Sequence, residues 1–343
     1  MREMSLVVLA LALVLPVVTL YAQGKPGAPA VSLSQDIALA AERRQEFFTY
    51  GMRIAPPWAD GGYLLINFPE HFEYRARSKG IIDYDNEAYR IWCSKCNGPQ
   101  LFMGPAEAKT VRCTVCGTES PIYNTANRLN LWQVTPDGQS AKLDVESITM
   151  PGAHVTMTAA VHGPRIDCTM KLDNRTDQEL KNLMVLFCHQ YRHLTGFPQW
   201  RGNLERNFVV VAGKLVAVAD LPTPKADSRI KATVVKGSPV ENSDWSKDQG
   251  GLTNTRIDLA LAIVSALEGD RKIVVCWWPG ERMLANGTIP CIHGDPYLGD
   301  LAAGKSVEVH GFILFTEGSV EAVIAESLAA HKAAVAKIPE WKP

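Results

Sequence analysis

The chain has 343 residues and a formal net charge of -1, with 35 Lys and Arg residues against 36 Asp and Glu residues. This length is enough for one large domain or two smaller ones. Because the charges balance and no basic stripe or tail stands out, the composition argues against nucleic acid as a partner.

The first 24 residues have the pattern of a secretory signal peptide. An apolar run extends from Leu6 to Leu20, and Ala22 and Gly24 supply the small residues that a cleavage site needs. An uncleaved membrane anchor is the alternative, but the run is shorter than the roughly 20 residues that span a bilayer. We therefore expect a secreted or periplasmic protein with no membrane span after cleavage of residues 1–24.

Residues 25–89 are expected to form a helical and irregular N-terminal region. The segment Ser32-Leu33-Ser34-Gln35 matches a capping box and predicts a helix over Asp36–Phe48. An irregular, aromatic-rich stretch follows it up to residue 89.

Two C-x-x-C pairs lie within residues 90–123, and sixteen residues separate them. Asn97 and Gly117 follow the pairs, and both residue types enter a left-handed turn at low cost. The motif resembles a zinc ribbon, which implies a closed structural zinc site with four thiolate ligands. Two disulfides, or iron and redox chemistry, are the alternatives. The four predicted zinc ligands are Cys93, Cys96, Cys113 and Cys116.

Residues 124–318 read as strands with a period of two. Arg165–Asp173 alternates with Ile166, Cys168, Met170 and Leu172 on one face. Gly213-Lys214 marks a hairpin turn. Many short strands with turns between them predict a mainly β fold, a large antiparallel sandwich, with a closing helix from about Val320 to Ile338 in residues 319–343. Further strands are expected at Leu180–Tyr191, Arg229–Val235, Arg256–Leu267, Lys272–Trp278 and Ser306–Phe315.

Two segments of this region are similar to parts of secreted sandwich domains in carbohydrate-processing proteins. One is the run from Leu298 to Val309, a leucine and a small-residue turn followed by a strand. The other is Leu172-Asp173-Asn174-Arg175-Thr176, a strand leading into a turn. The resemblance implies a sugar-related setting and carries over no catalytic residues.

Four cysteines lie outside the two pairs. Cys168 and Cys276 are expected to be buried thiols. In a simple hairpin, Cys168 would lie about three residues, or roughly 10 Å, out of register with Cys188, too far for a disulfide. Cys188 and Cys291 either form a structural disulfide or belong to a site.

Polar groups gather around Cys188 and Cys291. Cys291, His293 and Asp295 point the same way in an extended segment, whereas His189 and His193 share the strand face opposite Cys188. Thiols, imidazoles and carboxylates are the groups from which metal and acid–base sites are built. The residues predicted to act in catalysis are His293, Asp295, His189 and His193.

Tryptophans suggest a binding surface. Adjacent strand residues face opposite sides, so one of Trp277 and Trp278 is expected to face outward, and Trp200 falls in an expected loop. Exposed rings of this kind stack on sugars, although they can also simply cover sheet edges.

These features predict an exported zinc-binding sandwich protein that recognises a polysaccharide or another extracellular polymer. One alternative is an extracellular glycan hydrolase or lyase that uses the His/Asp cluster. Another is an assembly module that docks through the ribbon. The sequence alone leaves open whether the protein is an enzyme.

Overall fold

The structure is a computed structural model of the whole chain. It describes residues 30–34, 52–58, 60–75, 81–82, 90–93, 95, 98–103, 110–113, 115–121, 132–146, 153–199, 203–223, 229–236, 252–319 and 325. The expected signal peptide and the helix expected over residues 36–48 lie outside these ranges. So does the closing helix, apart from residue 325. The expectation of a helical and irregular region over residues 25–89 is wrong where the structure describes it, because Ser32–Ser34, Met52–Ala55 and Leu64–Arg75 are strands of the sandwich. Within the described ranges, no helix has both the length and the apolar character needed to cross a bilayer.

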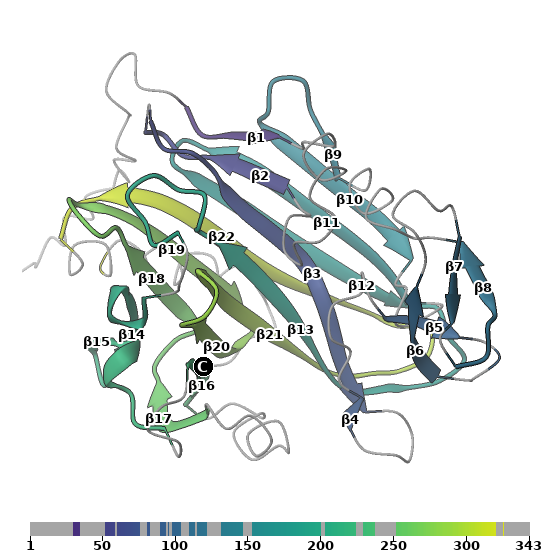
Figure 1. Cartoon of the computed structure of the whole chain (residues 1–343). Helices are drawn as coiled ribbons and strands as arrows, with labels where there is room; N and C mark the ends of the chain where they lie inside the picture. The colour runs from purple at the N-terminus through teal and green to yellow at the C-terminus, as the bar shows by residue number, and fades with distance from the viewer. Residues whose placement is uncertain are drawn as a thin grey trace, which may run out of the picture.

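Two nine-stranded sheets pack face to face, which confirms the predicted sandwich (Figure 1). We name them after the first two long strands predicted from the sequence. The β13 sheet has the order β1-β2-β3-β13-β21-β20-β16-β17, with β4 paired to β3. Its strands are β1 (Ser32–Ser34), β2 (Met52–Ala55), β3 (Leu64–Arg75), β4 (Ile81–Ile82), β13 (Leu180–Gln190), β21 (Cys291–Leu301), β20 (Gly280–Asn286), β16 (Ile230–Val235) and β17 (Leu252–Ile257).

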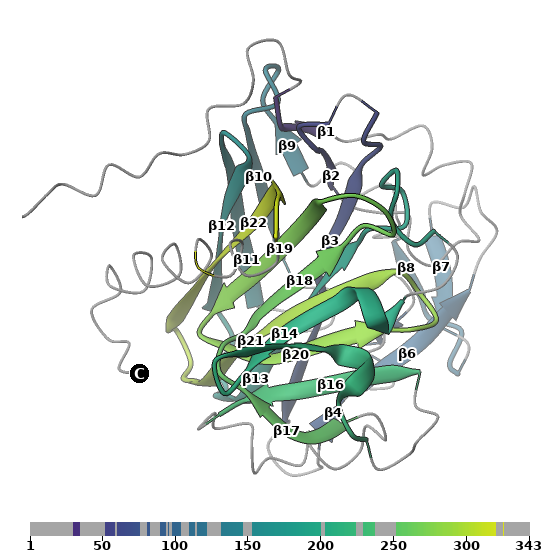
Figure 2. The same cartoon turned by 90° about the vertical axis from the view of Figure 1, so that its left-hand side faces the viewer.

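The β12 sheet forms the other layer, with the order β15-β14-β18-β19-β22-β12-β11-β10-β9. Figure 2 shows both layers after a quarter turn. The strands of this sheet are β15 (Lys214–Ala217), β14 (Asn207–Val211), β18 (Leu261–Ser265), β19 (Arg271–Trp278), β22 (Ser306–Glu317), β12 (Arg165–Asn174), β11 (Ala153–His162), β10 (Ser140–Glu146) and β9 (Trp132–Val134). Two short 3-10 helices, η1 (Leu204–Arg206) and η2 (Val218–Asp220), flank β14 and β15.

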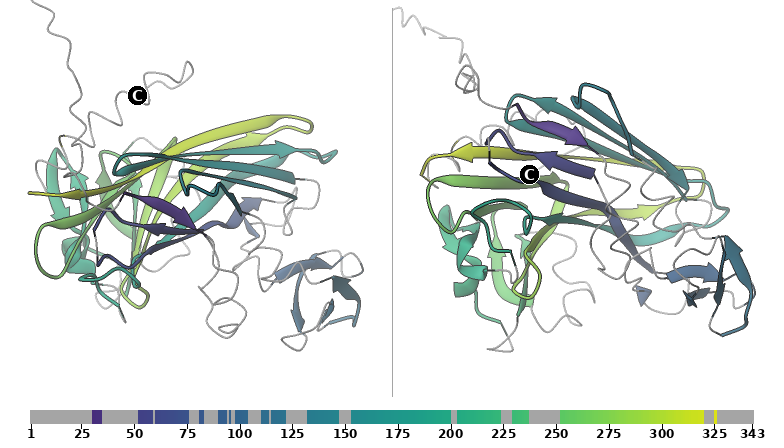
Figure 3. Two further views of the ribbon diagram at one scale, coloured as in Figure 1. Left: turned by 90° about the horizontal axis from the view of Figure 1, so that it is seen from above. Right: turned by 45° about the horizontal axis from the view of Figure 1, so that its top comes forward.

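A separate four-stranded sheet lies beside one end of the sandwich (Figure 3). Its order is β5-β6-β7-β8, and it contains β5 (Arg90–Cys93), β6 (Gly98–Met103), β7 (Thr110–Cys113) and β8 (Glu119–Pro121). The segment that the sequence marked as a ribbon is therefore a small sheet of its own.

Alternation of side chains explains the core. In β12, Ile166, Cys168, Met170 and Leu172 are all buried, at most 2% exposed, as the period of two predicts. Burial also raises the pKa of the Cys168 thiol well above its usual range, so it remains a protonated, unreactive core residue.

The assumed hairpin between β12 and β13 is wrong. β12 pairs with β11 and β22, whereas β13 pairs with β3 and β21 in the other sheet. Between them the chain changes layers, and the Asn174 amide donates to the Gln178 and Leu301 carbonyls at 2.7 and 3.0 Å. Cys168 and Cys188 thus lie in different sheets, and both are reduced thiols.

The β14–β15 hairpin is confirmed, with its turn one residue earlier than expected. Ala212 and Gly213 both have positive φ, +50° and +71°, as a type I′ turn requires. The Asp258 carboxylate accepts both of their backbone N–H groups, at 3.2 and 2.6 Å. The charged acceptor holds a non-glycine residue in the left-handed region.

Ala212→Asn should stabilise this turn by about 0.5–1 kcal/mol, because Asn-Gly is the preferred type I′ pair and Asn tolerates positive φ better than Ala. Ala212→Val should destabilise it, since a β-branched residue at positive φ is strained. Urea unfolding of both variants checks this prediction. Equal midpoints for the two would contradict it.

Candidate metal centres

The C-x-x-C pairs lie at the turns of two hairpins in the small sheet. Cys93 ends β5 and pairs with Gly98 across the first hairpin. Cys113 ends β7, pairs with Phe102 on β6, and begins the turn into β8. Cys96 lies outside the described residues. In both hairpins, a strand therefore ends at the first cysteine of a C-x-x-C pair.

The second knuckle has the backbone conformation predicted from its sequence. Gly117 has a φ of +70°, in the left-handed region. The Gly117 N–H donates to the Cys113 carbonyl, and the Cys113 N–H donates to the Thr118 carbonyl, both at 2.9 Å. Cys113 and Cys116 are reduced thiols, and Cys113 is 3% exposed. Two backbone hydrogen bonds therefore close this turn between the two cysteines of the pair.

A second cysteine-containing cluster lies on the β13 sheet. Leu183, Val185 and Phe187 of β13 belong to the sandwich core, so Cys188 and Gln190 lie on the other face. Ile292 of β21 also belongs to the core, which places Cys291 and His293 on that same outer face. Register brings them together, because Cys188 pairs with His293 and Gln190 with Cys291. The two predicted segments thus meet on adjacent strands.

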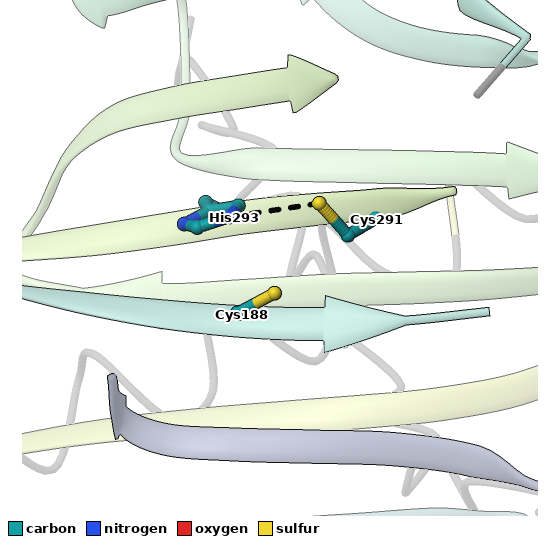
Figure 4. Close-up of side chains that lie close together, drawn as sticks. All are labelled: Cys188, Cys291 and His293. Carbon is teal, nitrogen blue, oxygen red and sulfur yellow. Dashed lines mark hydrogen bonds between the residues drawn. The ribbon is translucent and has the colours of Figure 1, made fainter. Parts of the chain in front are cut away.

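The metal-ligating atoms of Cys188, Cys291 and His293 all lie within 4.8 Å of one another. Figure 4 shows Cys188 on one strand, with Cys291 and His293 together on a neighbouring strand. The Cys291 Sγ and His293 Nε2 atoms are 3.7 Å apart. The three residues are 1%, 2% and 6% exposed. The thiols are reduced, so the alternative of a Cys188–Cys291 disulfide does not describe this structure.

Asp295 and Arg282 form a buried ion pair beside the cluster. Arg282 Nε donates to Asp295 Oδ2 at 2.9 Å, and the side chains are 2% and 0% exposed. Asp295 Oδ1 also accepts the Phe187 backbone N–H at 3.2 Å and lies 3.6 Å from His293 Nδ1. Burial favours the neutral acid, but the Arg282 charge and His293 outweigh it and lower the pKa of Asp295. Asp295 is therefore an ionised carboxylate that accepts from Arg282 and from the Phe187 N–H and lies beside His293.

His189 faces the sandwich core instead of the cluster. Its Nδ1 lies 3.1 Å from the Ile292 carbonyl and must donate to it, so Nε2 accepts from Trp277 Nε1 at 3.4 Å. Burial lowers the pKa of His189 to about 3, so the ring is neutral near pH 7. These hydrogen bonds account for a buried histidine at this position. Nothing in them supports the predicted catalytic role of His189.

His193 lies beyond the end of β13. Its ring stacks on Tyr63 with centroids 4.6 Å apart, and its Nε2 accepts from Arg192 Nε at 3.2 Å. Of the four residues predicted to act in catalysis, the structure thus places His293 and Asp295 side by side and His189 on the opposite face of the sheet.

One of the two adjacent tryptophans lies on the face of β19 away from the main core, as expected, but it is not exposed. Trp277 is fully buried and packs against Phe187, with ring centroids 4.1 Å apart. Trp278, on the other face of β19, is 6% exposed and stacks on His310. The expectation of an exposed ring is wrong, because an apolar cluster that includes Val274 and Phe312 buries this second face too. Trp200 lies outside the described residues.

Sequence reasoning missed Arg282 and Gln190. Met283 and Ala285 of β20 face the core, so a period of two puts Arg282 on the outer face. A charged residue on an outer face is normally solvated. Nothing local indicated that this one is buried against Asp295.

No family model matches the chain, and a search of curated proteins finds no match. Solved structures with a similar sandwich include a candidate aldose 1-epimerase from Klebsiella pneumoniae, with 12% identity, a TM-score of 0.38, and 82% of this chain and 83% of that chain covered. A candidate aldose 1-epimerase from Escherichia coli has 11% identity, a TM-score of 0.35, and coverage of 74% and 84%. A galactose mutarotase-like protein from Lactobacillus casei has 11% identity, a TM-score of 0.32, and coverage of 78% and 98%. This chain is similar to these sugar-related proteins in β-sandwich architecture, and the likeness assigns it neither ligand nor reaction.

Proposed function

We propose that this chain is an exported zinc-binding β-sandwich protein in which the small sheet β5–β8 holds a structural zinc ion. The observation that carries the proposal is the position of the C-x-x-C pairs at the two hairpin turns. Cys113 and Cys116 would supply two ligands, and Cys93 and Cys96 the other two. A closed four-thiolate site has no open position, so its role is to stabilise the small sheet.

Export is part of the same proposal and is based on the pattern of residues 1–24. Bound zinc would let four thiolates persist outside the cytoplasm, because metal ligation removes the free thiolate that oxidants attack. A zinc-loaded ribbon and an oxidising compartment are therefore compatible.

Cys113→Ala should remove about one zinc ion per chain, since a four-thiolate site loses most of its affinity with three ligands. Metal analysis of protein purified without added zinc measures this. The matched control is Cys168→Ala, which removes a buried thiol from β12 and should leave the zinc content unchanged. Disulfides among the four ribbon cysteines, with no metal lost in Cys113→Ala, would contradict the ribbon site.

The second candidate function is acid–base catalysis at His293 and Asp295 in an extracellular hydrolase or lyase. It is favoured by the pairing of Cys188 with His293, which joins the two segments that this hypothesis needs. His293 is 6% exposed, however, and Asp295 is fully buried. The tryptophan-based hypothesis of polysaccharide recognition now depends on residues such as Trp200, because Trp277 and Trp278 are both buried.

A further inference from the structure

We propose that Cys188, Cys291 and His293 form a second metal centre, a two-thiolate, one-imidazole site for zinc on the outer face of the β13 sheet. The site would be independent of the ribbon and made entirely by the sandwich. Asp295 would act as the partner that orients the His293 ring.

Distances support the ligand set. Zinc bonds of about 2.3 Å to sulfur and about 2.0–2.1 Å to nitrogen in a tetrahedron place neighbouring ligand atoms roughly 3.5–3.8 Å apart. The Cys291 Sγ to His293 Nε2 distance is already 3.7 Å. All three ligand atoms lie within 4.8 Å of one another, so shifts of about an ångström complete the set. Adjacent strands fix the three backbones, and the site needs no rearrangement of the sheet.

The orientation of His293 is that of a metal ligand. Its Nε2 faces the Cys291 sulfur, and its Nδ1 faces the Asp295 carboxylate at 3.6 Å. A ligating histidine commonly presents its other ring nitrogen to a carboxylate, which fixes the tautomer and raises ligand basicity. Asp295 is itself held by Arg282 and the Phe187 N–H. Arg282 and the Phe187 N–H thus hold in place the carboxylate that would orient the His293 ring.

The charge and the type of the donor atoms are compatible with a divalent cation. The Asp295 carboxylate and the Arg282 guanidinium cancel each other. Two thiolates would add two negative charges in a place where each ligand is at most 6% exposed. The two thiols lose their protons only when a metal binds, and a Zn²⁺ ion would then neutralise both thiolate charges. Thiolate and imidazole donors favour zinc over the hard cations that prefer oxygen.

Gln190 supplies an independent observation. Its side chain is fully buried, and neither its amide nitrogen nor its amide oxygen has a hydrogen-bond partner among the described residues. It lies on the same face as Cys188 and pairs in register with Cys291. Burying an amide without hydrogen-bond partners costs free energy, so a bound ion or water beside Gln190 is expected to supply the missing partner. We expect the fourth contact of the metal to involve Gln190, directly or through a bound water.

The test is a metal titration of the full-length chain, reduced and stripped with a chelator, using Co²⁺ as the probe. Wild type should bind about two equivalents, Cys291→Ala about one, Cys113→Ala about one, and the double variant none. The Co²⁺ absorption spectra of the two single variants should differ from each other. Cys291→Ala keeps a four-thiolate site, whereas Cys113→Ala keeps a two-thiolate, one-imidazole site. Failure of the ribbon and failure of this centre therefore give different results.

His293 provides a control for folding. His293→Ala should lose the second equivalent, whereas His293→Cys should retain it with a spectrum shifted toward thiolate ligation. Circular dichroism establishes that both variants are folded. Binding of two equivalents by Cys291→Ala and His293→Ala would overturn the second centre. So would a Cys188–Cys291 disulfide in the purified protein with metal at the ribbon only.

Discussion

Replacing Asp295 by alanine should lower the free energy of unfolding by about 3–5 kcal/mol, which is the usual cost of breaking a buried ion pair by removing one partner. The substitution leaves the Arg282 charge in place, 2% exposed, without its carboxylate. It also removes the acceptor of the Phe187 N–H. Chemical denaturation in the presence of a chelator measures the loss apart from any contribution of metal.

The matched control is the double variant Arg282→Met with Asp295→Leu. Buried ion pairs replaced by apolar residues of similar size are often neutral or stabilising, so this variant should recover most of the lost stability. If Asp295→Ala costs less than about 1 kcal/mol, or if the double variant is no better, the pair does not make the contribution expected of buried charges.

Replacing Trp277 by alanine should cost about 3–5 kcal/mol, as large-to-small changes in a closed core do. The ring is fully buried and lies against Phe187 and His189. The backbone of β22 also comes close to it. A Cβ at Gly311 would lie 2.4 Å from two atoms of the Trp277 ring, and a Cβ at Gly294 would lie 2.8 Å from a third. The indole thus fills a space that two glycines leave open.

Gly311→Ala provides the reciprocal experiment. Alone it should destabilise the protein by about 1–3 kcal/mol through overpacking. In the Trp277→Ala background the added methyl group enters the vacated space, so the combined cost should be smaller than the sum of the single costs. Additive costs, measured by thermal or urea unfolding, would show that the two positions do not share this space.

Local patterns predicted the strands better than their partners. Alternation identified β12 and its buried face, and the Gly213 turn identified β14 and β15. Which strands share a sheet depends on contacts between distant segments, so the β12–β13 hairpin was a reasonable but wrong assumption. The same limit explains Trp277 and Trp278. One face of β19 packs on the core, but an apolar cluster buries its other face too.

The site was partly predictable for the same reason. Period two correctly places Cys291, His293 and Asp295 on one face of β21, and puts Cys188 opposite His189 on β13. The alternation cannot show which side chains of β13 lie on the same face of the sheet as Cys291, His293 and Asp295. The structure brings Cys188 to His293 and turns His189 to the core. The ribbon motif, by contrast, lies within one short segment, and its turn at Gly117 follows from the sequence.

The order of β3, β13 and β21 in the sheet has a consequence for folding kinetics. These neighbouring strands come from distant parts of the chain, and such non-local pairing is slow because loop-closure entropy is lost before contacts form. The Cys188, Cys291 and His293 donors can meet only after β13 and β21 have paired. During refolding, coordination at the proposed centre should therefore appear after collapse. The proposed ribbon site, whose hairpins are local, should bind its ion first.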